Sequence, residues 1–68
     1  MDFQAIPRKI AEPQREEVRA LEPLERKVWI SVNGRKSIEH IAYMHNIVDD
    51  AKVEQVIRAL QERGWIDF

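Results

Sequence analysis

The sequence predicts a small, mainly α domain, with three packed helices, a minimal two-stranded sheet and an N-terminal arm or extra helix. A chain of 68 residues allows a single domain. The clearest helical stripe consists of apolar residues at i, i+3, i+4 and i+7, namely Val53, Val56, Ile57 and Leu60. Gly64 then supplies a helix stop, and Trp65–Ile66 resumes in residue types that favour strands.

Residues 1–13 are expected to form the arm, because two of the three prolines interrupt any helix there. The arm is either a frayed terminus or a segment that packs across this domain or a dimer mate. The domain proper is expected to span residues 14–68. Within it, residues 14–21 can form two helical turns if they dock, either separately or continuous with the next helix through a kink at Pro23.

A helix is expected over residues 23–32, since proline suits the first turn and Asn33–Gly34 is a strong stop. Its apolar positions face the core. The connection Arg35–Lys36 is expected to form a strand of one or two residues. Its partner would be Trp65–Asp67, and antiparallel pairing of the two would close the helical core into one unit.

Ser37 is a good N-cap for the following helix, which is expected over residues 38–45. The last helix is expected over residues 51–63. Asp49 or Asp50 would cap it and place negative charge at its N-terminus, where the helix dipole favours it.

Composition argues against several classes of protein. The chain has no cysteine, and therefore no disulfide framework, thiolate zinc site or cysteine nucleophile. No apolar run approaches the ~20 residues that cross a membrane, so we expect a cytoplasmic protein with no membrane partner. His40 and His45 fall on different helix faces, so no metal is expected. Without a Gly-rich phosphate loop or a nucleophile–base pair, we expect no enzyme and no cofactor.

Two stretches, VWISVNGRKSIEHIAYMHNI and VEQVIRALQERGWIDF, together resemble small winged-helix (helix-turn-helix) domains. The resemblance covers roughly Leu24 to Phe68. It consists of an apolar helix, an NG-basic-Ser-Ile corner, an IxxIA helix and a helix–glycine–strand unit. In that family a second strand normally completes the wing after this unit, so for a sequence that stops at Phe68 we expect either a truncated wing or a fragment of a longer protein. Winged helices serve DNA binding, dimerisation and protein docking alike.

The resemblance implies a DNA-binding module of a small transcription regulator, acting as a dimer and reading duplex DNA with the helix over residues 51–63. The candidate contacts with DNA are Arg35, Lys36, Lys52, Gln55 and Arg58. Gln55 suits adenine and Arg58 suits guanine or a phosphate, with Tyr43 and His45 as further phosphate contacts. The net charge of −1 argues against a polyanionic partner, because phosphate binders usually carry a basic excess.

The alternative is a protein-interaction or dimerisation module of a regulatory or signalling protein that does not bind DNA. Its candidate interface residues are Trp29, Tyr43 and Met44. Both tryptophans are otherwise expected to anchor the core, and an exposed one would mark an interface. A single continuous face of the basic candidates would favour DNA, whereas an exposed apolar patch would favour a protein partner.

Overall fold

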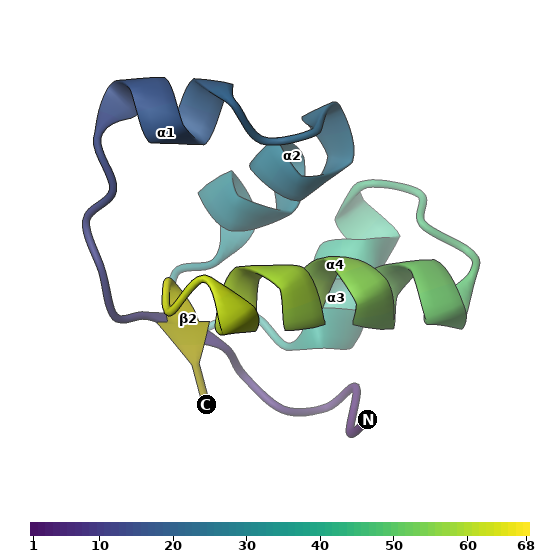
Figure 1. Cartoon of the computed structure of the whole chain (residues 1–68). Coiled ribbons are helices and arrows are strands. Elements are labelled where there is room, and N and C mark those ends of the chain that lie inside the picture. The colour runs from purple at the N-terminus through teal and green to yellow at the C-terminus, as the bar shows by residue number, and fades with distance from the viewer.

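Four helices and one two-stranded antiparallel sheet make up the chain in the computed structural model, which describes all of residues 1–68 (Figure 1). In chain order the elements are β1 (Arg8–Lys9), α1 (Arg15–Arg19), α2 (Pro23–Ser31), α3 (Ile38–Met44), α4 (Asp50–Glu62) and β2 (Ile66–Asp67). The strand pair lies at the C-terminal end of α4, with α1 and α2 on one side of that helix (Figure 1). The expectation of a mainly α fold is confirmed.

The helix boundaries follow from local chemistry. Pro23 is the first residue of α2, a position at which an N–H group would have no acceptor within the helix, so its absence costs no hydrogen bond. The Ser37 hydroxyl accepts a hydrogen bond from the His40 amide at 3.1 Å and caps α3. Asp49 caps α4 by accepting from the Ala51 amide at 3.0 Å. Gly64 has φ +77°, so it can turn the chain out of α4 and into β2.

The segment around residues 14–21 forms a helix separate from α2. The side chain of Glu17 accepts the Gln14 amide at 3.2 Å at the start of α1. At the other end, the Arg26 guanidinium donates to the Arg19 carbonyl at 3.1 Å and to the Leu21 carbonyl at 3.2 Å. These carbonyls lie at the negative end of α1, so Arg26 both satisfies them and complements the helix dipole.

The core is a single cluster of twelve buried apolar residues, to which α4 contributes Val53, Val56, Ile57 and Leu60. This is the predicted stripe, and it packs mainly against α2. Trp29 and Trp65 are 6% and 7% exposed, with their ring centroids 5.3 Å apart, so the expected core role of both tryptophans is confirmed. Burial of each large apolar side chain contributes about 1.5–3 kcal/mol.

The predicted strand at Arg35–Lys36 is wrong. The Asn33 side-chain oxygen accepts the amides of Arg35 and Lys36, at 2.9 and 3.2 Å, and so holds this connection as a turn. Amides that are used within a turn cannot join a β ladder. Instead β1 pairs with β2, with Arg8 opposite Asp67 and Lys9 opposite Ile66.

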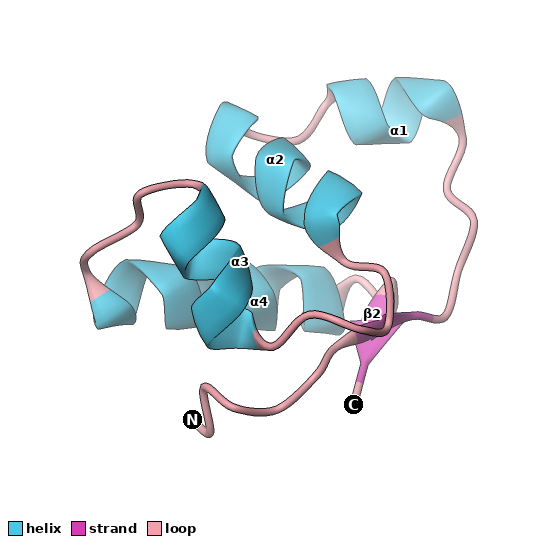
Figure 2. Ribbon diagram, turned by 180° about the vertical axis from the view of Figure 1, so that it is seen from behind, coloured by secondary structure: helices cyan, strands magenta, loops and turns pink.

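The arm packs across its own domain, which is one of the two expected arrangements. The Phe3 carbonyl accepts the Glu39 amide at 2.8 Å, and the Ala5 carbonyl accepts the Ile38 amide at 3.0 Å. Both amides belong to the first turn of α3, where a helix has no internal acceptors for them. Pro7 is fully buried. In both views the first residues run along α3 and α4 towards the strand pair (Figures 1 and 2).

Candidate functional site

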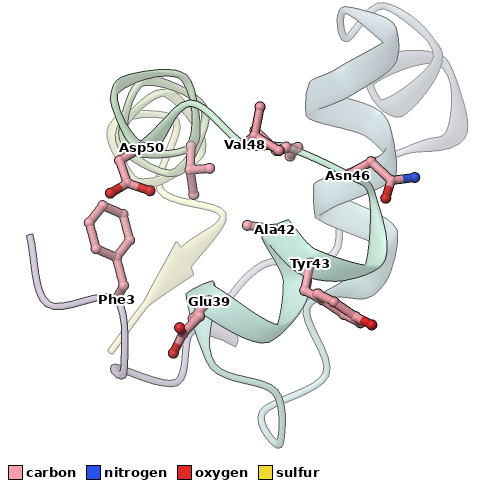
Figure 3. A pocket seen from close by; sticks show the side chains of 9 residues that line it. Phe3, Glu39, Ala42, Tyr43, Asn46, Val48 and Asp50 are labelled. Carbon is pink, nitrogen blue, oxygen red and sulfur yellow. The ribbon is translucent and has the colours of Figure 1, made fainter.

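A groove with a volume of about 420 Å³ opens between the N-terminal arm, α3 and the beginning of α4. It is lined by Phe3, Glu39, Ala42, Tyr43, Asn46, Ile47, Val48, Asp50 and Val53. Figure 3 shows Ala42 in the middle, Phe3 across from it and Val48 above. Tyr43 and Asn46 lie at the margin, with their side chains directed outwards. We call this feature the α3–α4 groove.

The turn between the two helices shapes the α3–α4 groove. Asn46 has φ +55°, a left-handed conformation that asparagine tolerates better than most residues. The next amide, that of Ile47, donates to the Ala42 carbonyl at 2.9 Å, which closes the end of α3. Ile47 is half-buried against the core, and Val48 follows it at the surface. The sequence thereby places apolar side chains on both sides of the turn.

Two apolar side chains at the groove are unusually open to solvent. Tyr43 is 82% exposed and Val48 is 94% exposed. Met44, the other interface candidate on α3, is exposed but does not line the groove. Trp29, the third interface candidate, is only 6% exposed and packs against Trp65 in the core, so it offers little apolar surface to a partner. Val48 and Phe3 belong to the groove and were missed by the sequence argument.

The rim of the α3–α4 groove is acidic. Glu39 and Asp50 line it, and none of the nine lining residues is lysine or arginine. The Gln4 side-chain amide donates a hydrogen bond to the Glu39 carboxylate. Beside the groove, Glu54 contacts the Met1 ammonium at 3.5 Å and Arg58 at 3.2 Å. The hydrogen bond from Arg58 is the main cause that lowers the pKa of Glu54.

The candidate DNA contacts come from two segments, the connection between α2 and α3 and the helix α4. Lys52 and Gln55 line a smaller hollow of about 130 Å³ between α2 and α4, which also contains Glu22 and Glu25. Arg58 is engaged by Glu54. The loop that connects α2 to α3, to which the other two candidates belong, passes beside the strand pair, whereas α4 begins at its opposite end (Figure 2). Lys52 and Gln55 belong to the first half of α4, so part of the length of that helix separates them from its C-terminal end.

Basic side chains do gather at the strand pair, where sequence reasoning did not place them. Lys9 Nζ lies 4.6 Å from the centre of the Trp29 ring, and the Arg63 guanidinium lies 5.3 Å from that of Trp65. Burial lowers the pKa of Lys9. Arg8 approaches the turn at Gly34, since a Cβ placed there would lie 3.6 Å from Arg8 Cγ. These residues lie together because β1 pairs with β2, and no short-range sequence pattern indicates that pairing.

The side chains of His45 and Ser31 contact each other between two helices and are not free surface groups. Ser31 is 8% exposed. Its hydroxyl donates to the Lys27 carbonyl at 3.0 Å, and His45 Nε2 lies 2.6 Å from the same oxygen. With the hydroxyl proton directed at Lys27, Nε2 is the donor of this second hydrogen bond. His45 therefore joins the end of α3 to α2 and does not extend the candidate DNA contacts.

Neither a group of metal-binding side chains nor a membrane-spanning helix is found in the structure. No three His, Cys, Asp or Glu side chains form a group that could hold a metal ion. None of the four helices combines the length and the apolar character needed to cross a bilayer. Comparison of the chain with protein-family models, with curated proteins and with solved structures gives no match.

Proposed function

We propose that the chain is a protein-interaction module of a regulatory or signalling protein, and that its α3–α4 groove docks a polypeptide segment of a partner. We further propose that its helices and strand pair form a winged-helix core. The observation that carries the docking proposal is the exposure of Tyr43 (82%) and Val48 (94%) beside a groove with an apolar floor. Exposed apolar surface around a concavity is typical of protein interaction sites.

The energetics of docking favour this groove over the rest of the surface. A partner that covers Val48 removes an almost fully exposed apolar side chain from water, which contributes roughly 1.5–3 kcal/mol. Tyrosine is enriched at interface hot spots because it adds apolar area and a polar hydroxyl with few rotatable bonds. The walls are helices capped by Ser37 and Asp49, so little ordering of the backbone is required on binding.

A selection from random peptides tests the proposal without knowledge of the natural partner. Peptides displayed on phage are selected on the immobilised chain and then mapped by ¹H–¹⁵N NMR. We expect related peptides that shift the resonances of Ala42, Ile47 and Val48. Val48→Glu places a charge in the interface and is expected to weaken their binding by at least about tenfold.

Ile30→Glu is the matched control, because Ile30 is 65% exposed on α2 and does not line the groove. Its peptide binding is expected to equal that of the wild-type chain. The proposal is rejected if selection gives no related peptides, or if the selected peptides bind Val48→Glu as tightly as the wild type.

DNA binding is the second candidate, as in a small transcription regulator. The observation that favours it is the basic group at the strand pair, where Lys9 and Arg63 form no ion pair with a carboxylate and Arg8 donates to the main-chain oxygen of Phe68 at 3.4 Å. Against it stand the acidic neighbours of Lys52 and Gln55. The same immobilised chain, exposed to random duplex at about 50 mM salt, separates the two candidates. Absence of binding there rejects DNA, because non-specific affinity is strongest at low salt.

A further inference from the structure

The α3–α4 groove combines an apolar floor with a rim of one charge sign. Its apolar lining comes from the arm, from α3 and its turn, and from α4. Glu39 lies in the first turn of α3 and Asp50 in the first turn of α4, so the two acids flank the groove from different helices. The absence of lysine and arginine from the lining leaves these two charges without a cationic side chain inside the groove.

The charged groups nearby do not cancel this negative rim. The Met1 ammonium and Arg58 both contact Glu54, outside the groove lining. Asp49 adds a further carboxylate, which is held by the Ala51 amide as the cap of α4. The positive end of the α4 dipole is equivalent to roughly half an elementary charge, which is less than the charge of Asp49 and Asp50 together. Gln4 donates one hydrogen bond to Glu39 but adds no charge.

We infer that the groove takes a polypeptide segment whose apolar side chains are flanked by lysine or arginine. This inference rests on the proposed function and specifies the chemistry of its partner. The apolar side chains cover Val48 and the floor around Ala42, and the basic side chains reach Glu39 and Asp50. An acidic segment would bring like charges together at the rim, and a neutral segment would leave the rim carboxylates without ionic partners.

Three short peptides test the charge preference. They share one apolar face and carry lysine, glutamine or glutamate at all other positions. Binding is measured by fluorescence anisotropy at about 50 mM and about 300 mM salt, and its location is checked by the NMR shifts of Ala42 and Val48. We expect the lysine peptide to bind at least about tenfold more tightly than the glutamate peptide at low salt, and this ratio to fall at high salt.

Variants of the chain locate the effect. The double variant Glu39→Gln, Asp50→Asn retains Asp49 as the cap of α4 and is expected to lose most of the preference for lysine. Glu62→Gln removes an acid at the other end of α4 and is expected to leave the preference unchanged. Circular dichroism verifies that each variant is folded.

The possible outcomes separate the inference from the function on which it rests. Equal affinity of the three peptides at the groove, or a lysine preference that survives the double variant, rejects the inference and leaves the docking function intact. Failure of all three peptides to shift the groove resonances rejects the inference, and the display selection then decides the docking function by itself.

Discussion

The α3–α4 groove and the strand pair lie towards opposite ends of α4, and they are built in different ways. The groove consists mainly of residues 39–53, which are neighbours in sequence, together with Phe3 from the arm. The strand pair joins Arg8–Lys9 to Ile66–Asp67, from opposite ends of the chain. Most of the groove depends on two caps and a turn between neighbouring helices, whereas the strand pair requires segments from opposite ends of the chain to meet. The groove is therefore easier to predict from the sequence than the strand pair.

The two ends also differ in charge. Acids flank the groove, whereas Arg8, Lys9 and Arg63 gather around the tryptophans at the strand pair. The net charge of −1 describes neither face. A nearly neutral total can conceal two faces of opposite sign, and the field at a face, rather than the total, determines which partner is attracted. Net charge is consequently a weaker argument against a polyanionic partner than the position of the charges.

Leu60→Ala is expected to give the largest effect, because both ends share one core. Leu60 is fully buried, and its truncation should lower the free energy of unfolding by about 2–5 kcal/mol. Urea denaturation followed by Trp fluorescence at the strand pair and by NMR at Val48 measures each end separately. We expect both signals to change in a single transition.

Gln61→Ala is the matched control for that substitution, because Gln61 is exposed on the next position of α4. Its effect should stay within about 0.5 kcal/mol. Two separate transitions in Leu60→Ala would show that the ends are independent units, and an unchanged midpoint would show that Leu60 does not belong to the core.

The elements that sequence reasoning predicted correctly are those with short-range causes. The stripe of α4, the caps at Ser37 and Asp49 and the stop at Gly64 each depend on residues a few positions apart. Tyr43 lies at the groove, and its role in an interface stays a prediction. These features could be read because helix periodicity and capping act locally.

The features that could not be predicted depend on competition between distant segments. Two-residue strands have no periodicity, so nothing in the sequence indicates Arg8–Lys9 as the partner of β2. The predicted partner, Arg35–Lys36, does not pair with β2 because the Asn33 side chain accepts its two amides. The position of Phe3 in the groove has the same kind of cause, because the carbonyls of the arm accept amides from the first turn of α3, far away in the sequence.

Gly64→Ala is expected to give an intermediate effect that begins at the strand pair. At φ +77°, alanine is strained by about 1–2 kcal/mol, and no atom lies within 4 Å of the added Cβ, so the cost arises from the backbone alone. Gly64→Asn should cost less, because asparagine tolerates this conformation better. Hydrogen exchange measures where the loss begins. We expect faster exchange at Ile10, whose amide donates to Trp65, than at Ile47 in the groove.

Equal acceleration of exchange at both positions would contradict the difference between the two ends. It would mean that the strand pair opens only when the whole domain unfolds. A loss of stability in Gly64→Asn equal to that in Gly64→Ala would contradict the backbone explanation, because the two side chains differ chiefly in their tolerance of positive φ.

Arg58→Gln is expected to give the smallest effect, and one that depends on pH. Arg58 lowers the pKa of Glu54, so the contact stabilises the fold at neutral pH and its contribution is lost as pH falls through the native pKa of Glu54. Urea midpoints of the variant and of wild type should therefore differ slightly at about pH 7 and converge at about pH 3.

Arg15→Gln, at an exposed arginine that forms no ion pair, is the control and should show no such convergence. Because the pair is exposed, high salt should also remove the difference at neutral pH. A difference that persists at low pH would mean that Arg58 acts by packing on α4 rather than through its charge. Glu54 also holds the Met1 ammonium, so NMR shifts in the variant should concentrate at the arm and the groove and leave Ile66 unchanged.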